Sequence, residues 1–181
     1  KLYANFAEGF VGTGIKKDEY ICDCSDIDDV IVFRKDGTYS VSKVSSKAFF
    51  GKNIIHVGIF RKNDERLTYN AVYTDGQSKK TMAKRFNVTS ITRDKEYTVT
   101  KGTTNSKLHY FSVNPNGEAE VVNVYLHAAA KARVKLFEYD FSELAIKGRN
   151  SQGNMVTKYP VRKVDLKEKG VSTIGGRDIW Y

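Results

Sequence analysis

The sequence predicts an all-β domain of the β-propeller type, built from about four repeated antiparallel blades of roughly 40 residues. The chain is rich in Val, Ile, Thr, Tyr and Phe and poor in Leu, Ala and Glu, a composition typical of strands. No window combines a sustained 3.6-residue period with helix caps. Turn signals recur at Gly37, Gly76, Gly117 and Gly153, at intervals of 39, 41 and 36 residues.

The repeat turns each predict a pair of strands. The glycines follow Asp36, Asp75, Asn116 and Gln152, and Asp-Gly and Asn-Gly favour a two-residue hairpin turn whose central residues both need positive φ. An apolar run precedes each turn, as in residues 30–33 and 110–113, and a strand-like segment follows, as in 39–42. A hairpin in each unit of 40 residues leaves room for about four strands per blade.

Length and composition indicate one domain over residues 1–181. The chain has 40% apolar and 12% aromatic residues, enough for a core and too many for a disordered segment. It has no apolar run near 18 residues and no signal peptide, and Cys22 and Cys24 are best interpreted as reduced thiols, so we expect a cytoplasmic protein. Because it lacks an initiator Met and ends in strand-like residues at 179–181, we expect a fragment of a longer protein.

Charge is unevenly distributed along the chain. The 30 basic and 21 acidic residues give a net charge of +9, with −3 in residues 1–39 and +12 in residues 40–181. Equivalent positions of a ring of blades share a rim, so repeated basic residues predict a band that binds duplex DNA. Lysines that keep sheet edges soluble are the alternative. The candidate DNA-binding residues are Lys43, Lys47, Lys79, Lys80, Lys84, Arg85, Lys131, Arg133, Lys135, Arg149, Lys158, Arg162 and Lys163.

Motifs for catalysis or metal binding are not found. The acidic residues Asp23, Asp26, Asp28 and Asp29 do not have EF-hand spacing and predict a loop in which Asp side chains bond backbone amides. The glycines of residues 9–14 do not match a dinucleotide-binding fingerprint. We therefore expect no catalytic residue, no metal site and no cofactor in this chain.

Two stretches carry a resemblance to a known family. Residues 8–20 read EGFVGTGIKKDEY, and residues 22–37 read CDCSDIDDVIVFRKDG. Together with the repeated turns, this sequence resembles the C-terminal domain of bacterial type IIA topoisomerase A subunits over nearly all 181 residues. The branch that it resembles most is topoisomerase IV, with DNA gyrase next; the chain lacks the Q-R-R-G-G-x-G box of gyrase A subunits.

The resemblance implies a β-pinwheel, a propeller-like ring whose blades exchange strands and whose basic rim binds and bends DNA. It also implies a parent enzyme that partners a B subunit with ATPase activity, uses ATP and Mg²⁺ on other domains, and controls supercoiling and decatenation. The family's nucleophilic tyrosine directly follows an arginine, and this chain has no Arg-Tyr pair. The catalytic tyrosine is therefore expected outside this chain.

Two other functional classes stay open at this point. A protein-binding propeller of the WD-repeat type has a similar period, although the chain has no Trp-Asp pair and its single Trp is Trp180. A propeller enzyme that acts on sugars or uses a metal would need acids that converge on a central channel, and the spacing shows no repeated inward acid.

Overall fold

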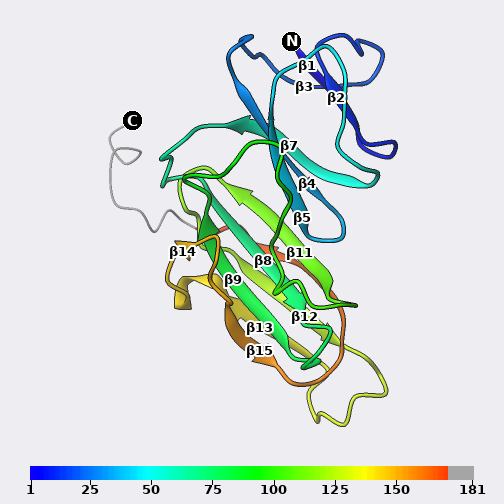
Figure 1. Ribbon diagram of the computed structural model, residues 1–181. Helices are drawn as coiled ribbons and strands as arrows, with labels where there is room; N and C mark the ends of the chain where they lie inside the picture. Colours follow the sequence, from blue (N-terminus) through cyan, green and yellow to red (C-terminus); the bar gives the residue numbers. More distant parts are fainter. Residues whose placement is uncertain (171–181) are drawn as a thin grey trace. The chain divides into compact units, whose positions relative to one another are not determined.

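The computed structural model describes residues 1–170, and these form an all-β protein (Figure 1). Four sheets of three to five strands are present, antiparallel except for one short parallel pairing. The described range contains one helical turn, the 3₁₀ helix η1 (Phe141–Glu143), and no helix long and apolar enough to cross a membrane. The strand-like residues 179–181 lie outside the described range.

The chain divides into two compact units, which are described separately. Unit 1 contains Lys1–Asn63 and Ser90–Val99, and unit 2 contains Asp64–Thr89 and Thr100–Tyr181. Each unit holds two sheets. The single domain expected from the sequence stays a prediction.

Unit 1 contains the sheets β3-β1-β2-β6 and β10-β5-β4-β7. Alternation of buried and less buried side chains along β1 places one face of the first sheet in the core, whereas β4 of the second sheet is buried on both faces. Leu2, Ala4 and Val11 of the first sheet pack with Val30 and Val32 of the second. The strands are β1 (Leu2–Asn5), β2 (Phe10–Gly12), β3 (Glu19–Cys22), β4 (Asp29–Arg34), β5 (Thr38–Lys43), β6 (Ala48–Phe49), β7 (Ile54–Phe60) and β10 (Tyr97–Thr98).

Unit 2 contains a five-stranded sheet, with β11-β8-β9-β14 in order and β15 also paired with β9, and the sheet β13-β12-β16. Its core joins Val72 and Ala83 of the larger sheet to Val122, Val124 and Phe141. The strands are β8 (Thr68–Thr74), β9 (Thr81–Asn87), β11 (Lys107–Asn114), β12 (Val121–Leu126), β13 (Leu136–Asp140), β14 (Lys147–Gly148), β15 (Asn154–Thr157) and β16 (Val161–Glu168). The short strand β14 is the one that runs parallel to its neighbour.

A regular exchange of strands relates the four sheets. Each has a central strand, β1, β4, β8 or β12, flanked by the next strand and by a third strand of the same repeat. The segment between the second and third strands reaches back to the preceding sheet: β6 pairs with β2, β10 with β5, and β14 and β15 with β9. The exchange implied by the family resemblance is thus present within both units.

Only two of the four predicted hairpin turns join paired strands. Asp36-Gly37 lies between β4 and β5, and Asp75-Gly76 lies between β8 and β9. Gly117 (φ 63°) instead lies where the chain passes from β11 to β12, two strands of different sheets. Gly153 (φ 81°) lies between β14 and β15, which both pair with β9 and not with each other. The hairpin predictions at Gly117 and Gly153 are therefore wrong.

The two turns that join paired strands lie where predicted, but neither is the predicted two-residue hairpin, and they use glycine for different reasons. The β4–β5 connection has three residues, and Gly37 has a φ of 91° while Asp36 does not have positive φ, as in a turn followed by a left-handed residue. The β8–β9 loop has six residues, and Lys79 takes the positive φ of 62°. A Cβ on Gly76 would lie 1.8 Å from the Thr104 carbonyl oxygen, so close approach of backbone explains that glycine.

Candidate nucleic-acid interface

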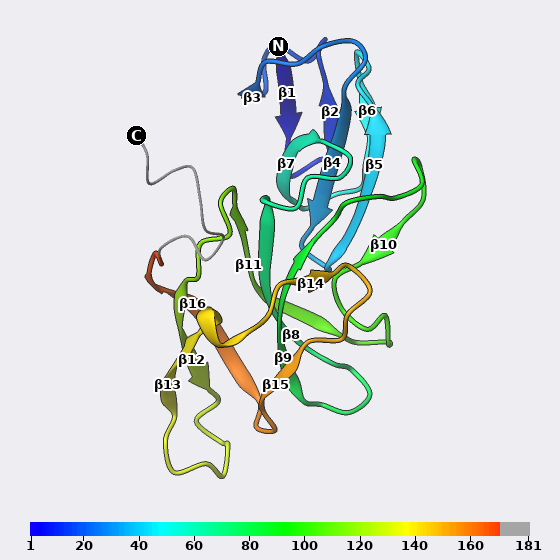
Figure 2. The ribbon, with the colours of Figure 1, turned by 90° about the vertical axis from the view of Figure 1, so that its left-hand side faces the viewer.

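Seven predicted DNA-binding residues are exposed in or directly beside three connections of unit 2. Two lie in the β8–β9 loop, two in the β12–β13 loop, one in the turn between β15 and β16, and two at the start of β16; Figure 2 shows all three connections at the lower end of the unit. We call this set the basic edge: Lys79, Lys80, Lys131, Arg133, Lys158, Arg162 and Lys163.

Strand exchange brings the three connections together. Thr157 of β15 pairs with Thr81 of β9, and the two strands are antiparallel. Lys158, which follows Thr157, and Lys80, which precedes Thr81, therefore lie at the same end of the pair. On β16, Lys163 pairs with Tyr125 of β12. The amide of His127, at the start of the β12–β13 loop, donates to the Pro160 carbonyl at 3.0 Å. The basic edge is therefore one continuous feature of unit 2.

The local charge of the basic edge is strongly positive. The segments that carry it, residues 76–83, 127–134 and 157–164, contain its seven basic residues and no acidic one. Asp75, which begins the β8–β9 loop, accepts bonds from Thr103 and from the Ser78 amide, and these lower its pKa to about 2. Asp165 lies 3.6 Å from Lys163. A net field of this sign attracts a polyanion.

Aromatic rings orient several of these cations. The Arg162 guanidinium lies 5.3 Å and the Lys163 ammonium 4.7 Å from the centroid of the Tyr125 ring. The Lys158 ammonium lies 5.5 Å from the centroid of Tyr159. Cation–π contacts of this length reduce the freedom of long side chains while the charges stay in solvent.

Two predicted residues, Lys84 and Arg85, are not on the surface. Each is 3% exposed on β9. Lys84 donates to the Arg149 carbonyl at 2.8 Å, and Arg85 donates to the carbonyls of Gly117 at 2.9 Å and Leu144 at 3.1 Å. Buried cations that bond backbone carbonyls cannot reach a phosphate, so we remove both residues from the candidate set.

The other predicted residues are more scattered. Lys135 is half-buried and donates to the carbonyls of Ala130 and Ala132, and Arg149 is half-buried and donates to Asn150 Oδ1 at 2.9 Å. Lys43 and Lys47 are exposed in unit 1.

The acidic stretch of residues 23–29 forms a hydrogen bond of the predicted kind at Asp28, whose carboxylate accepts from the Ser25 amide at 2.7 Å.

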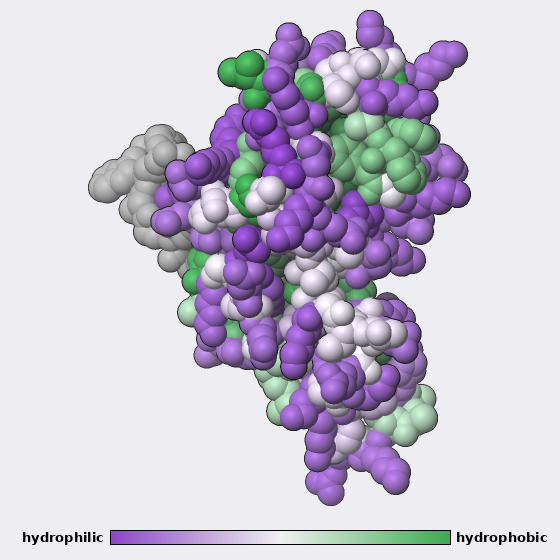
Figure 3. Space-filling view, viewed as in Figure 1, coloured by the Kyte–Doolittle hydropathy of each residue, from purple (hydrophilic) through white to green (hydrophobic). Residues whose placement is uncertain are grey.

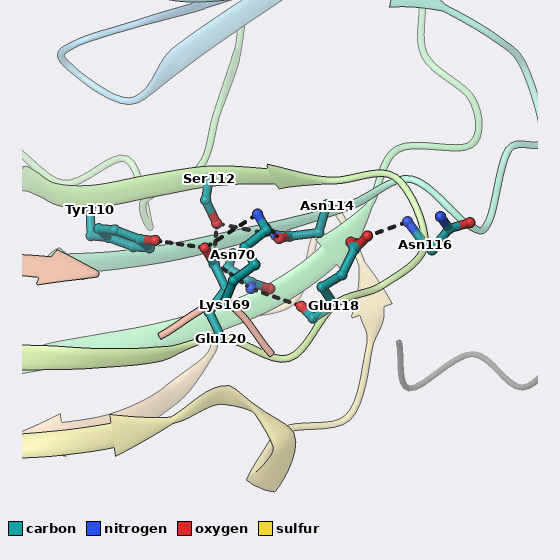
Figure 4. Close-up of polar contacts among 8 residues, drawn as sticks. All are labelled: Asn70, Tyr110, Ser112, Asn114, Asn116, Glu118, Glu120 and Lys169. Atoms are coloured by element: carbon teal, nitrogen blue, oxygen red, sulfur yellow. Dashed lines mark hydrogen bonds and ion pairs between the residues drawn. The ribbon is translucent and has the colours of Figure 1, made fainter. Parts of the chain in front are cut away.

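Sequence reasoning missed a polar cluster around a buried carboxylate (Figure 4). Glu120 is 1% exposed and accepts hydrogen bonds from Tyr110, from Ser112 and, at 3.0 Å, from Asn70. Lys169 lies 3.7 Å from Glu120 and donates to Asn114 at 3.2 Å. Burial and the neighbouring carboxylate raise the pKa of Tyr110. The cluster fixes the passage from β11 to β12, and polar residues at 110, 112 and 114, on one side of a strand, were its signal.

Comparison with known proteins identifies the family of this chain. A family model described as the topoisomerase C-terminal domain of Bacteroidota matches residues 1–169, and the chain belongs to this family. It is also similar to the A subunit of DNA topoisomerase 4 from Borreliella burgdorferi, at 27% identity over 168 residues. The match covers 92% of this chain and 25% of the relative, so the chain spans about a quarter of that protein's length. The family indicated by residues 8–37 is confirmed.

Proposed function

We propose that this domain binds duplex DNA without regard to sequence and bends it, as the accessory C-terminal domain of a type IIA topoisomerase A subunit. The basic edge of unit 2 is the observation that carries the proposal, and the family membership supports it. The named relative favours the topoisomerase IV branch. In this proposal the strand-exchanging sheets are blades of a β-pinwheel, and the domain itself needs no cofactor.

The parent enzyme in this proposal is cytoplasmic and works with a B subunit that hydrolyses ATP. ATP, Mg²⁺ and the catalytic tyrosine then belong to other domains. The C-terminal domain would bend the DNA segment next to the cleavage core. The bend would influence which DNA crossings the enzyme acts on in supercoiling and decatenation.

The physical mechanism is neutralisation of phosphates. Each cation that meets a phosphate releases a condensed counterion, so seven contacts give a slope of log K against log salt of about −6. Bending 20–30 base pairs smoothly costs on the order of 1–6 kcal/mol, which added contacts along the curve offset. No recognition helix is present in residues 1–170, and phosphate contacts alone carry no sequence information.

The test is binding of a random-sequence duplex of about 40 base pairs at several salt concentrations, with labelled ends that report bending. In the edge variant, Lys80, Lys158, Arg162 and Lys163 are replaced by Ala. We expect a salt slope shallower by about 3 to 4 and a loss of the shortened end-to-end distance.

A matched control removes the same charge elsewhere. In it, Lys16, Lys17, Lys52 and Lys62, exposed lysines of unit 1, are replaced by Ala. We expect this variant to keep the slope and the bend. Equal losses in both variants would show that net charge, and not the basic edge, governs binding. Absence of binding by the unmodified chain at low salt would reject the DNA-binding proposal itself.

A further inference from the structure

The first sheet of unit 1 carries four aromatic side chains on one face. Tyr3 on β1 pairs with Tyr20 on β3, and Phe10 on β2 pairs with Phe49 on β6. The ring centroids of these two pairs lie 5.9 and 5.3 Å apart. We call this set, Tyr3, Phe10, Tyr20 and Phe49, the aromatic face.

The aromatic face points away from the core. Along β1, Leu2 and Ala4 are buried in the core of unit 1, so Tyr3 between them faces the other side of the sheet. Tyr20 is 50% and Phe49 61% exposed. In Figure 3 an apolar area bordered by hydrophilic side chains is visible in the region of this sheet. Clustered exposed aromatic residues mark interaction surfaces more often than single exposed ones do.

Carboxylates adjoin the aromatic face. Asp23 accepts the hydroxyl of Tyr20 at 2.8 Å, and Asp18 accepts from Asn5 of β1 at 3.3 Å. Residues 1–28, which supply β1 to β3 and their connections, contain six acidic and three basic residues, and Lys47 beside β6 adds one positive charge. This part of the chain is thus negatively charged, while the chain as a whole is positively charged. Like charges across an interface oppose binding, so these carboxylates disfavour a nucleic acid as the occupant.

The same surroundings favour a cationic occupant. Lys and Arg are attracted to the faces of Tyr and Phe rings, and nearby carboxylates add to the attraction. The protein already shows one such contact, because the Lys47 ammonium lies 4.5 Å from the centroid of the Phe10 ring. Arg and aromatic residues are also the side chains that most often dominate protein–protein interfaces.

We propose that the aromatic face binds a Lys- or Arg-bearing segment of a protein partner. The cationic side chains stack on the exposed rings of Tyr20 and Phe49 and form ion pairs with the carboxylates of Asp18 and Asp23. This surface belongs to unit 1 and shares no residue with the basic edge of unit 2, so the proposal does not depend on DNA binding.

The test uses the full chain, isotopically labelled for NMR, and titrates it with the peptide hexaarginine. We expect saturable shift changes centred on the aromatic face and on Asp18 and Asp23. A Tyr20→Ala/Phe49→Ala variant should weaken the affinity at least tenfold, and an Asp18→Asn/Asp23→Asn variant should weaken it and flatten its salt dependence. Because all four side chains lie at the surface or its edge, unchanged spectra elsewhere will show that the variants fold.

A matched control replaces two exposed apolar residues of unit 2, Met155 and Leu166, by Ala and should leave the affinity unchanged. Shift changes that map elsewhere, or that survive in both test variants, would overturn the proposal. So would binding of a thymidine decamer to the aromatic face in place of hexaarginine. Concentration-dependent self-association that the Tyr20→Ala/Phe49→Ala variant abolishes would identify a second copy as the occupant and overturn it too.

Discussion

Two dibasic pairs on either side of the start of β9 have the same charge and opposite surroundings. Lys79 and Lys80 are exposed in the β8–β9 loop, while Lys84 and Arg85, which begin four residues after Lys80, are buried on β9. Adjacent strand residues face opposite sides of a sheet, and backbone carbonyls cover β9 on both sides: Arg149 meets Lys84, and Gly117 and Leu144 meet Arg85. A basic residue in this fold therefore either bonds the carbonyls of an exchanged backbone segment or is exposed to solvent.

Unit 1 also has a buried cation that bonds an exchanged segment. Arg34, at the end of β4, is 8% exposed and donates to the Phe50 carbonyl, which follows the exchanged strand β6. It also forms an ion pair with Glu96 at 2.8 Å, beside the exchanged strand β10. Buried cations thus hold exchanged segments in place in both units, and the charge count of the sequence overstates the charge available to a polyanion.

The largest effect expected from this comparison follows the substitution Arg85→Met. It leaves the buried carbonyls of Phe141, Leu144 and Gly117 without this donor, so we expect a loss of about 3–5 kcal/mol in the free energy of unfolding. Urea denaturation measures it. Arg133→Met, at an exposed arginine, should change the same quantity by less than about 0.5 kcal/mol. Similar values for the two variants would contradict the structural role of Arg85.

A smaller effect, dependent on pH, is expected for Lys84. Burial, and after it the charge of Arg149, lowers the pKa of Lys84 to about 8, against 10.5 for an exposed lysine. Between these values the unfolded chain binds more protons than the folded one, so folding becomes more favourable as pH rises and the cost of the buried charge is fully present below pH 8.

The pH effect is measured against the variant Lys84→Met, which lacks the titrating group. From pH 8 to pH 10 the unfolding free energy of the unmodified protein should rise by about 2 kcal/mol relative to the variant. Using the difference removes the contribution of tyrosines common to both proteins. A difference that stays constant over this pH range would show that Lys84 is not desolvated as the structure indicates.

The sequence predicted the all-β class and the number of sheets, because strand composition and turn chemistry are local properties. It located the Asp36-Gly37 and Asp75-Gly76 turns, and it misplaced hairpins at Gly117 and Gly153. Glycine at 153 has a second cause that no local pattern reveals: a Cβ there would lie 2.6 Å from the Ala83 carbonyl oxygen, on a strand about 70 residues earlier.

In the candidate site, too, the features that depend on local sequence were predicted and those that depend on distant segments were not. The exposed lysines of loops, such as Lys79, Lys80 and Lys131, were predicted from turns and charge. The burial of Lys84 and Arg85 depends on residues 117–149, which fold back on β9, and the sequence of β9 itself carries no sign of them. Glu120 is different: the alternating polar residues of β11 hinted at a polar cluster, but Glu120 lies outside that strand, and another of its donors comes from β8.

The smallest expected effect is on DNA binding, and it distinguishes the exposed pair Lys79 and Lys80 from the buried pair Lys84 and Arg85. Lys79→Ala/Lys80→Ala removes two exposed charges of the basic edge, so the affinity for duplex DNA at low salt should fall by about tenfold and the salt slope should become shallower by about 1.8. The free energy of unfolding should change by less than about 0.5 kcal/mol, because neither side chain is buried. The Arg85→Met variant should show the reverse, with weakened stability and, at a temperature where it stays folded, an unchanged salt slope. If Lys79→Ala/Lys80→Ala leaves the slope unchanged, the β8–β9 loop does not meet phosphate, and the basic edge narrows to the connections that flank β12 and β16.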